Sequence, residues 1–155
     1  MPRSLTESDE QKLQRILHEL HDRCEADSCL LCDDAGHVLC QLGVENQDPL
    51  VISALGAGVF AASRELAMLL GEDKFSALVH QGEKKSIYIS AVNVDVLLVV
   101  LFSSQVSLGV VKLYSAPAAA AAKAVVESQP AAGTATGDAV FRLSQKGELF
   151  AKSDS

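Results

Sequence analysis

Residues 74–103 constrain the fold more than any other part of the sequence, because they hold three predicted strands with very short connections. The strands are "KFSALVHQG" (74–82), "SIYISAV" (86–92) and "VDVLLVVLFS" (94–103). Such short connections join antiparallel strands, since a parallel crossover needs a dozen or more residues. The apolar run "VLLVVLF" has no polar interruption. We therefore expect the last of these strands in the middle of a sheet, with both faces covered.

The residues before this region predict a helix, a hairpin and a second helix. Leu5 to about Ala26 carries apolar residues at helical spacing, with Ser8 and Gln11 as its predicted capping box. Cys29–Asp33 and His37–Leu42 predict two strands joined by the turn "DDAG". Leu50–Leu70 predicts the second helix, and we expect Ile52, Leu55, Val59, Leu66 and Leu70 to form its core-facing stripe.

A third helix is predicted from residue 107 to residue 128, after the strands, and Pro117 should either kink it or restart it as a second segment from Ala118 to Glu127. The whole is an α/β (α+β) fold of order α-β-β-α-β-β-β-α, with a five-stranded antiparallel sheet between helices. We expect one domain over residues 1–128. The composition of "QPAAGTATGD" (129–138) is typical of a flexible linker. Residues 139–155 form a tail, which is either a tethered binding motif or a frayed terminus.

Charge and hydropathy exclude several classes of function. The formal net charge is −7, which disfavours binding to nucleic acid or to anionic membranes. The N-terminus has no apolar core of a signal peptide, and the longest apolar run, residues 96–102, is too short to span a bilayer. We therefore expect a cytoplasmic protein without membrane insertion, whose cysteines remain thiols.

All four cysteines lie in "CEADSCLLCDDAGHVLC" (24–40), a spacing that raises the question of a metal or iron–sulfur site. Cys29 and Cys32 are three residues apart on one predicted strand, so their side chains point to opposite faces of the sheet. A second ligand pair is missing, as is the distant fourth cysteine of a plant-type ferredoxin. His18, His21 and Cys24 share a helical face and remain the weaker alternative. We predict no metal and no cofactor.

No catalytic motif emerges from the rest of the chain. The sequence has no G-K-[ST] phosphate loop and no G-x-S-x-G, and His80 has no obvious catalytic partner. Asp33 and Asp34 are interpreted as turn residues. We therefore predict no enzymatic activity of the chain itself.

Small residues on the second helix are the feature that core packing does not explain. Ala54, Ala57, Gly58 and Ala61 line a face rotated away from the apolar stripe, and Glu65 and Met68 continue it. Glycine inside a helix costs about 1 kcal/mol relative to alanine. The cost is understandable where another backbone must come close, so we favour a docking face. The alternative is that this face packs on the sheet of its own domain.

The element order and several stretches resemble the roadblock/dynein light-chain family, and in particular its bacterial MglB branch. The matching stretches are "LLCDDAGHVL", "LGAGVFAASRELAMLLGEDKF", "VHQGEKKSIYIS", "VLLVVLF" and "SLGVVKL". The resemblance covers about residues 8–127. It implies a homodimer whose second helices lie side by side and whose third strands pair, so that one continuous sheet forms.

The resemblance also implies a function. An MglB-like dimer binds one MglA-like, Ras-like GTPase, stimulates GTP hydrolysis and can influence nucleotide exchange by holding the switch regions, without a catalytic group of its own. Bacteria use such a pair for polarity in motility. Carried over, the GTPase-binding surface is Ala54, Ala57, Gly58, Ala61, Glu65 and Met68, and the dimer interface is Leu78, Val79, His80 and Gln81.

Two points go beyond the resemblance. Arg64 and Glu65 place charged groups beside the small residues, where they either narrow the choice of GTPase or weaken its binding. An arginine finger at Arg64 is the less favoured interpretation. A non-catalytic scaffold of a polarity complex is the alternative function. The tail is a candidate site for the same GTPase or for a further polarity protein.

Overall fold

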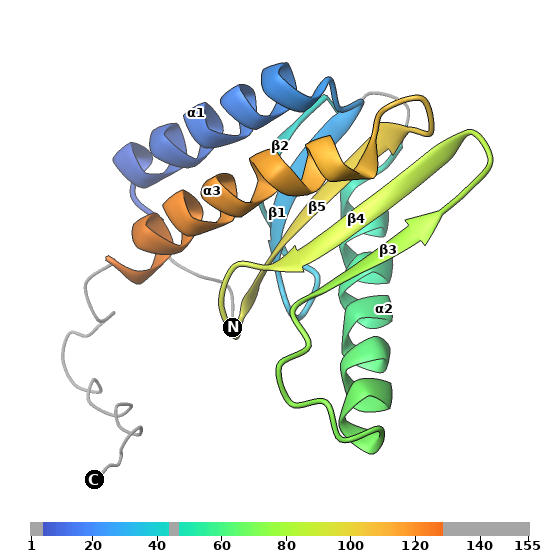
Figure 1. Cartoon of the computed structure of the whole chain (residues 1–155). Helices are drawn as coiled ribbons and strands as arrows, with labels where there is room; N and C mark the ends of the chain where they lie inside the picture. The colour runs from blue at the N-terminus through green and yellow to red at the C-terminus, as the bar shows by residue number, and fades with distance from the viewer. Residues whose placement is uncertain (1–4, 44–46, 129–155) are drawn as a thin grey trace, which may run out of the picture. The chain divides into compact units, whose positions relative to one another are not determined.

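The computed structural model describes residues 5–43 and 47–128, which include all the predicted helices and strands (Figure 1). The chain divides after Ala124, and of the second unit only residues 125–128 are described, most of which end the last helix. The predicted linker (129–138) and tail (139–155) lie outside the described residues. The elements are α1 (Glu7–Cys24), β1 (Ser28–Asp33), β2 (Val38–Leu42), α2 (Pro49–Leu69), β3 (Ala77–Gln81), β4 (Lys85–Ala91), β5 (Val96–Ser103) and α3 (Leu108–Glu127).

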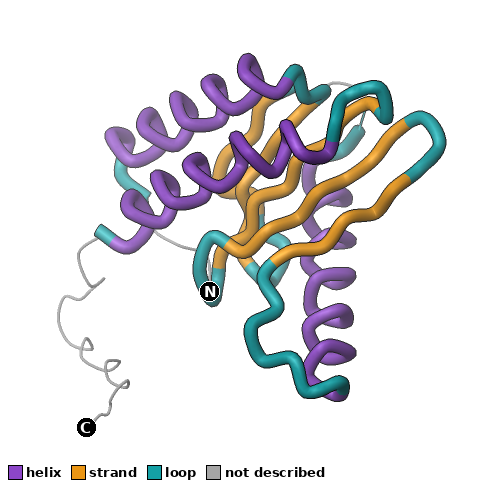
Figure 2. The backbone as a smooth tube through the Cα atoms, in the orientation of Figure 1, coloured by secondary structure: helices purple, strands orange, loops and turns teal. Residues whose placement is uncertain are grey.

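The five strands form one antiparallel sheet of order β2-β1-β5-β4-β3. The predicted fold class is confirmed, and so is the central place of β5, which pairs with β1 on one side and β4 on the other. Figure 2 shows α1 and α3 along one face of the sheet and α2 along the other. The uninterrupted apolar sequence of β5 follows from this arrangement, because each of its faces is covered by a helix layer.

The α1 helix packs as its periodicity predicts. Leu13, Leu17 and Leu20 are buried against the sheet, while the charged residues of α1 other than Asp9 are exposed. The capping box lies two residues earlier than predicted. The Thr6 hydroxyl accepts a hydrogen bond from the Asp9 amide (3.0 Å), and the Asp9 carboxylate accepts one from the Thr6 amide (3.2 Å). The reason is that the helix begins at Glu7, which puts Asp9 at the third helical position.

The α2 helix begins one residue before the predicted Leu50, with Asp48 as its cap and Pro49 at its first turn. Its orientation on the sheet differs from the prediction. The side that packs on the sheet consists of Ser53, Gly56, Ala57 and Phe60, and the core on this face also includes Leu30, Cys32, Ile89, Leu97 and Val99. Of the predicted core stripe only Ile52 contacts this core, whereas Leu55 is 65% exposed and Leu66 is 59% exposed.

The close approach of α2 to the sheet explains why its small side faces inward. A Cβ atom on Gly56 would lie 3.6 Å from Ile89 Cδ1 and 3.8 Å from Val99 Cγ2, which is ordinary contact distance. Phe60 completes the inner side, and its ring lies 5.1 Å from the ring of Phe75. Small residues thus bring the helix axis near the strands, and the larger aliphatic residues remain on the outer side.

Candidate functional site

The outer side of α2 is the most unusual surface of the described residues. It carries a row of exposed aliphatic side chains: Leu50, Val51, Leu55, Val59, Leu66, Met68, Leu69 and Leu70. Figure 1 shows the last turns of α2 extending beyond the strands, where Leu69 is 84% exposed. Single exposed apolar residues are common, but a contiguous apolar patch marks a surface that another molecule covers.

Two flanks can be distinguished on this outer side. We define the aliphatic flank as Leu55, Val59, Leu66 and Leu70, and the small flank as Ala54, Gly58, Ala61, Glu65 and Met68. Gly56 faces Ile89 of β4 and Val99 of β5. Successive residues of an α-helix are rotated by about 100°, which places the aliphatic flank next to Gly56 on the helix surface. Ala54 instead contacts Gly36 in the β1–β2 turn. The aliphatic flank therefore lies toward β4 and β3, and the small flank lies toward β1 and β2.

The structure places five of the six residues predicted to bind a GTPase on one exposed flank. Ala54, Gly58, Ala61, Glu65 and Met68 are all exposed, and a Cβ atom on Gly58 would meet nothing within 4 Å. Ala57 is the exception. It is 5% exposed and belongs to the core between α2 and the sheet. Its prediction as a surface residue is wrong, because the small side of the helix extends round to the sheet.

The four residues predicted at the dimer interface lie on β3, an edge strand of the sheet. Leu78 packs against the core beneath α2, Val79 is half-buried, and His80 and Gln81 lie at the more open end of the strand. Beyond β3 the described chain supplies no further strand. At the opposite edge, the Gln14 amide of α1 donates to the Gln41 carbonyl of β2 (3.2 Å). Because open edges favour pairing with another strand, β3 is the edge suited to a second chain.

Arg64 does not extend from the small flank. Its guanidinium lies over the ring of Phe60, 5.2 Å from the centroid, and the residue is half-buried. This contact directs the charged group toward the sheet side of α2. The arrangement disfavours the arginine-finger interpretation, since a finger must reach away from its own helix.

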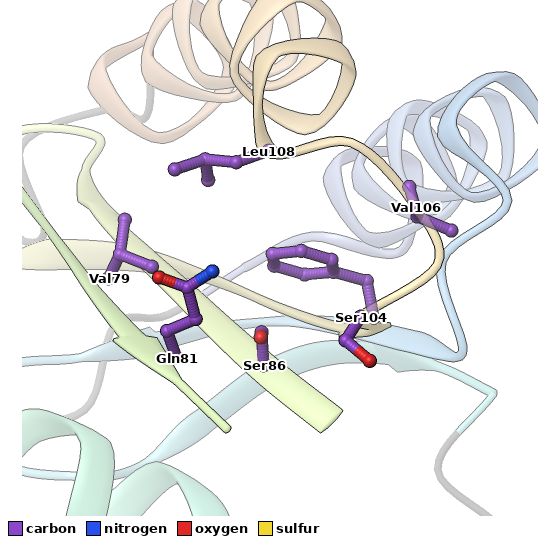
Figure 3. Close-up of a pocket in the computed structure, with 7 residues that line it drawn as sticks. Val79, Gln81, Ser86, Ser104, Val106 and Leu108 are labelled. Atoms are coloured by element: carbon purple, nitrogen blue, oxygen red, sulfur yellow. The ribbon is translucent and has the colours of Figure 1, made fainter. Parts of the chain in front are cut away.

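Two hollows among the described residues differ widely in size. The smaller has a volume of about 30 Å³, room for about one water molecule, and lies between Val79, Gln81, Ser86, Phe102, Ser104, Val106 and Leu108 (Figure 3). A larger open hollow of about 730 Å³ includes His18, His21 and His80. Within the described residues, no group of three His, Cys, Asp or Glu side chains is arranged to hold a metal ion.

The four cysteines are buried free thiols. As predicted from their spacing, Cys29 and Cys32 face opposite sides of the sheet: Cys29 Sγ donates to the Leu17 carbonyl of α1 (3.5 Å), and Cys32 lies in the core beneath α2. Burial raises the pKa of Cys29 and of Cys32 to about 12 and that of Cys40 to about 11. Thiols with such pKa values stay protonated at neutral pH and are poor nucleophiles and ligands.

One polar cluster was not predicted from the sequence. Asp33 and His37 were interpreted only as turn and strand residues, but the Asp33 carboxylate accepts a hydrogen bond from His37 Nδ1 (2.9 Å). The Asp33 side chain is 5% exposed. The spacing of Asp and His on either side of a tight turn is the signal that indicates such a pair.

By length and composition, α2 is the one described helix that is long and apolar enough to cross a membrane, with 22% of the relevant window buried. In this fold it connects β2 to β3 and packs on the sheet between them. An apolar outer side and an apolar inner side on one helix account for its composition.

Comparison with known proteins identifies the family. The Roadblock/LC7 domain matches residues 12–102. No match was found among curated protein sequences. Among solved structures, the gliding protein MglB from Thermus thermophilus is 32% identical with a TM-score of 0.75, over 83% of this chain and 100% of that one. Myxococcus xanthus MglB is 32% identical with a TM-score of 0.75, over 81% and 95%. An MglB with a tetrameric arrangement is 33% identical with a TM-score of 0.75, over 83% and 98%. The chain therefore belongs to the Roadblock/LC7 domain family and is an MglB-like member of it.

Proposed function

We propose that this chain is a cytoplasmic, MglB-like regulator of a small Ras-like GTPase of the MglA type, and that it acts as a homodimer. The observation that carries the proposal is the open apolar side of α2 next to the open edge of β3, in a chain 32% identical to MglB over most of its length. A folded chain that leaves both features exposed is suited to a partner that covers them.

The dimer seam consists of β3 and the aliphatic flank. The aliphatic flank is the part of α2 that lies toward β3. A two-fold axis beside β3 therefore pairs this strand with its copy and brings the two aliphatic flanks together. The sheet then continues across the dimer. This arrangement covers Leu55, Val59 and Leu66, which are between 44% and 65% exposed in the single chain.

The small flank remains open in such a dimer and receives the GTPase. Ala54, Gly58 and Ala61 have little or no side chain, so the backbone of a switch region can come close to the helix. The dimer acts by fixing switch regions in the conformation that hydrolyses GTP, and the GTPase supplies its own catalytic groups. The contact between Arg64 and Phe60 supports this division of roles, because it leaves Arg64 engaged within α2.

The test is a single-turnover GTPase assay with an MglA-type GTPase, with and without this protein. We expect Ala61→Arg to fold and dimerise normally and to abolish stimulation, because the long charged side chain keeps the switch backbone away from α2. Ala120→Arg is the matched control, since Ala120 is an exposed helical alanine on α3. Stimulation by Ala61→Arg equal to that of the control would contradict the proposal.

The second candidate function is a scaffold that binds a GTPase without changing hydrolysis. The presence of Glu65 in the middle of the small flank favours it, because a carboxylate there interrupts the bare backbone surface. The same assay separates the two functions. For a scaffold, light scattering should detect a complex of two chains with one GTPase, while the hydrolysis rate stays unchanged.

A further inference from the structure

The β1–β2 turn, residues 33–37, is held by a dense set of hydrogen bonds around one buried carboxylate. Asp33 Oδ1 accepts from the amides of Ala35 (3.0 Å) and His37 (2.8 Å), and Oδ2 accepts from His37 Nδ1 (2.9 Å). The backbones add two bonds, from the Asp33 amide to the His37 carbonyl and from the Gly36 amide to the Asp33 carbonyl. A turn with this many bonds has one conformation, and Gly36 is fixed in it at a φ of +92°.

This rigid turn is in direct contact with α2. A Cβ atom on Gly36 would lie 3.0 Å from Ala54 Cα, which is closer than real Cβ atoms normally come to a backbone atom. The buried Ser53 hydroxyl lies 2.8 Å from the Gly36 carbonyl and is placed to donate to it or to the Pro49 carbonyl of its own helix. The turn therefore sets how near the sheet α2 can lie at Ala54.

Ala54 is also the first residue of the small flank, so the turn and the proposed GTPase surface meet at one residue. We propose that the β1–β2 turn is a positioning element for that surface: Asp33 and His37 fix the turn, and Gly36 fixes the distance of α2 from the sheet. The inference rests on the proposed function of the small flank. It adds residues outside α2 to those that determine stimulation.

The physical reason is the precision that stimulation requires. Holding switch regions in a catalytic conformation depends on the position of the helix that they touch, and a displacement of about 1 Å can cost up to a hundredfold in rate. A methyl group on Gly36 requires the backbone of Ala54 to move by a few tenths of an ångström. The displacement is transmitted along α2 to Gly58 and Ala61, because a helix moves as a rigid element.

The test uses a pair of matched glycine variants in the full-length protein. Gly36→Ala and Gly71→Ala both place a side chain at positive φ, at +92° and +84° respectively, so both carry the same kind of backbone strain. Only Gly36→Ala also creates a clash, since a Cβ atom on Gly71 meets nothing within 4 Å. We expect Gly36→Ala to lower the maximal stimulated rate of GTP hydrolysis about threefold or more, because the displacement is a fraction of 1 Å. Gly71→Ala should leave that rate unchanged.

A second measurement is independent of any GTPase. Amide hydrogen exchange in the first turns of α2 should be faster in Gly36→Ala than in Gly71→Ala at equal global stability. Equal exchange, or equal maximal stimulated rates in the two variants, would overturn the positioning role. Absence of stimulation by the wild-type protein would instead reject the proposed function, and the exchange comparison would still decide the role of the turn. If Gly36→Ala does not fold, Ser53→Ala takes its place with the same expected results.

Discussion

The helices α1 and α2 cover opposite faces of one sheet, and both have apolar residues at helical spacing, but the two stripes point in opposite directions. In α1 the stripe packs on the sheet, and Leu13 and Leu17 are fully buried. In α2 most of the stripe faces away from it, and Leu55 is 65% exposed. The same pattern therefore has a different structural meaning in each helix.

The outer sides of the two helices explain the difference. The outer side of α1 is charged and carries an ion pair between Arg23 and Glu19 (3.4 Å), as suits a surface in contact with water. The outer side of α2 is aliphatic over most of its length. Apolar periodicity thus indicates which side of a helix is buried in the assembled protein. It does not indicate whether the neighbour on that side is the helix's own sheet or another chain.

A charge on the outer side of each helix tests this difference most directly. We expect Val59→Asp to weaken dimerisation by about a hundredfold or more, because the two-fold axis buries two unpaired carboxylates for each dimer. Arg15→Asp, on the exposed side of α1, should have no such effect. Light scattering over a concentration series gives the dimer dissociation constants. A dimer of unchanged affinity in Val59→Asp would show that the aliphatic flank is not the seam.

A second test compares the two stripes by their contribution to the stability of the single chain. In the Val59→Asp background, Leu17→Ala should lower the free energy of unfolding by about 3 kcal/mol, as expected for a cavity in a packed core. Leu55→Ala should change it by less than about 0.5 kcal/mol, because that side chain remains in water without a partner chain. Urea unfolding measures both values. Similar losses for the two variants would remove the distinction between the helices.

The two glycines of α2 distinguish its sheet side from its outer side. Alanine at either position should stabilise the helix by about 0.5–1 kcal/mol through its higher helix propensity. On the sheet side, a Cβ atom on Gly56 has room, with its nearest neighbour at 3.6 Å. We expect Gly56→Ala to keep full GTPase stimulation and Gly58→Ala to reduce it, since only Gly58 lies on the small flank. Thermal unfolding and the GTPase assay together provide the readout.

The smallest expected effect is a pH dependence at the β1–β2 turn. Burial alone would raise the pKa of Asp33, but hydrogen bonds from His37 and from the Ala35 amide outweigh it, so this pKa lies below its ordinary value of 3.8. A lowered pKa means that Asp33 contributes stability above about pH 4 and loses it as the pH falls through the folded-state pKa. The stability difference between wild type and Asp33→Asn should therefore shrink in urea unfolding as the pH is lowered from about 5 to about 3. A constant difference would contradict this assignment.

Several elements could be predicted from the sequence because local patterns decide them. Short connections between residues 74 and 103 require antiparallel strands, and the unbroken apolar run of β5 requires a central place in the sheet. The charged outer side of α1 leaves one orientation for that helix. The odd spacing of Cys29 and Cys32 separates the two thiols onto opposite faces.

Other features depend on contacts between distant parts of the chain. Ala57 is buried and its neighbour Gly58 is exposed because of the way α2 is rotated on the sheet. Local pattern does not fix this rotation, since either apolar side of the helix could pack on the sheet. The contact between Gly36 and Ala54 joins residues on separate elements, and no local pattern indicates it.

The order of elements, the antiparallel sheet and the inward side of α1 follow from the sequence, because hydrophobic spacing and connection length act within a few residues of the chain. The side of α2 that meets the sheet, and the small residues that remain exposed on it, are fixed by the packed fold. Because α2 is apolar on both sides, the choice depends on how closely small side chains let the helix approach Ile89 and Val99.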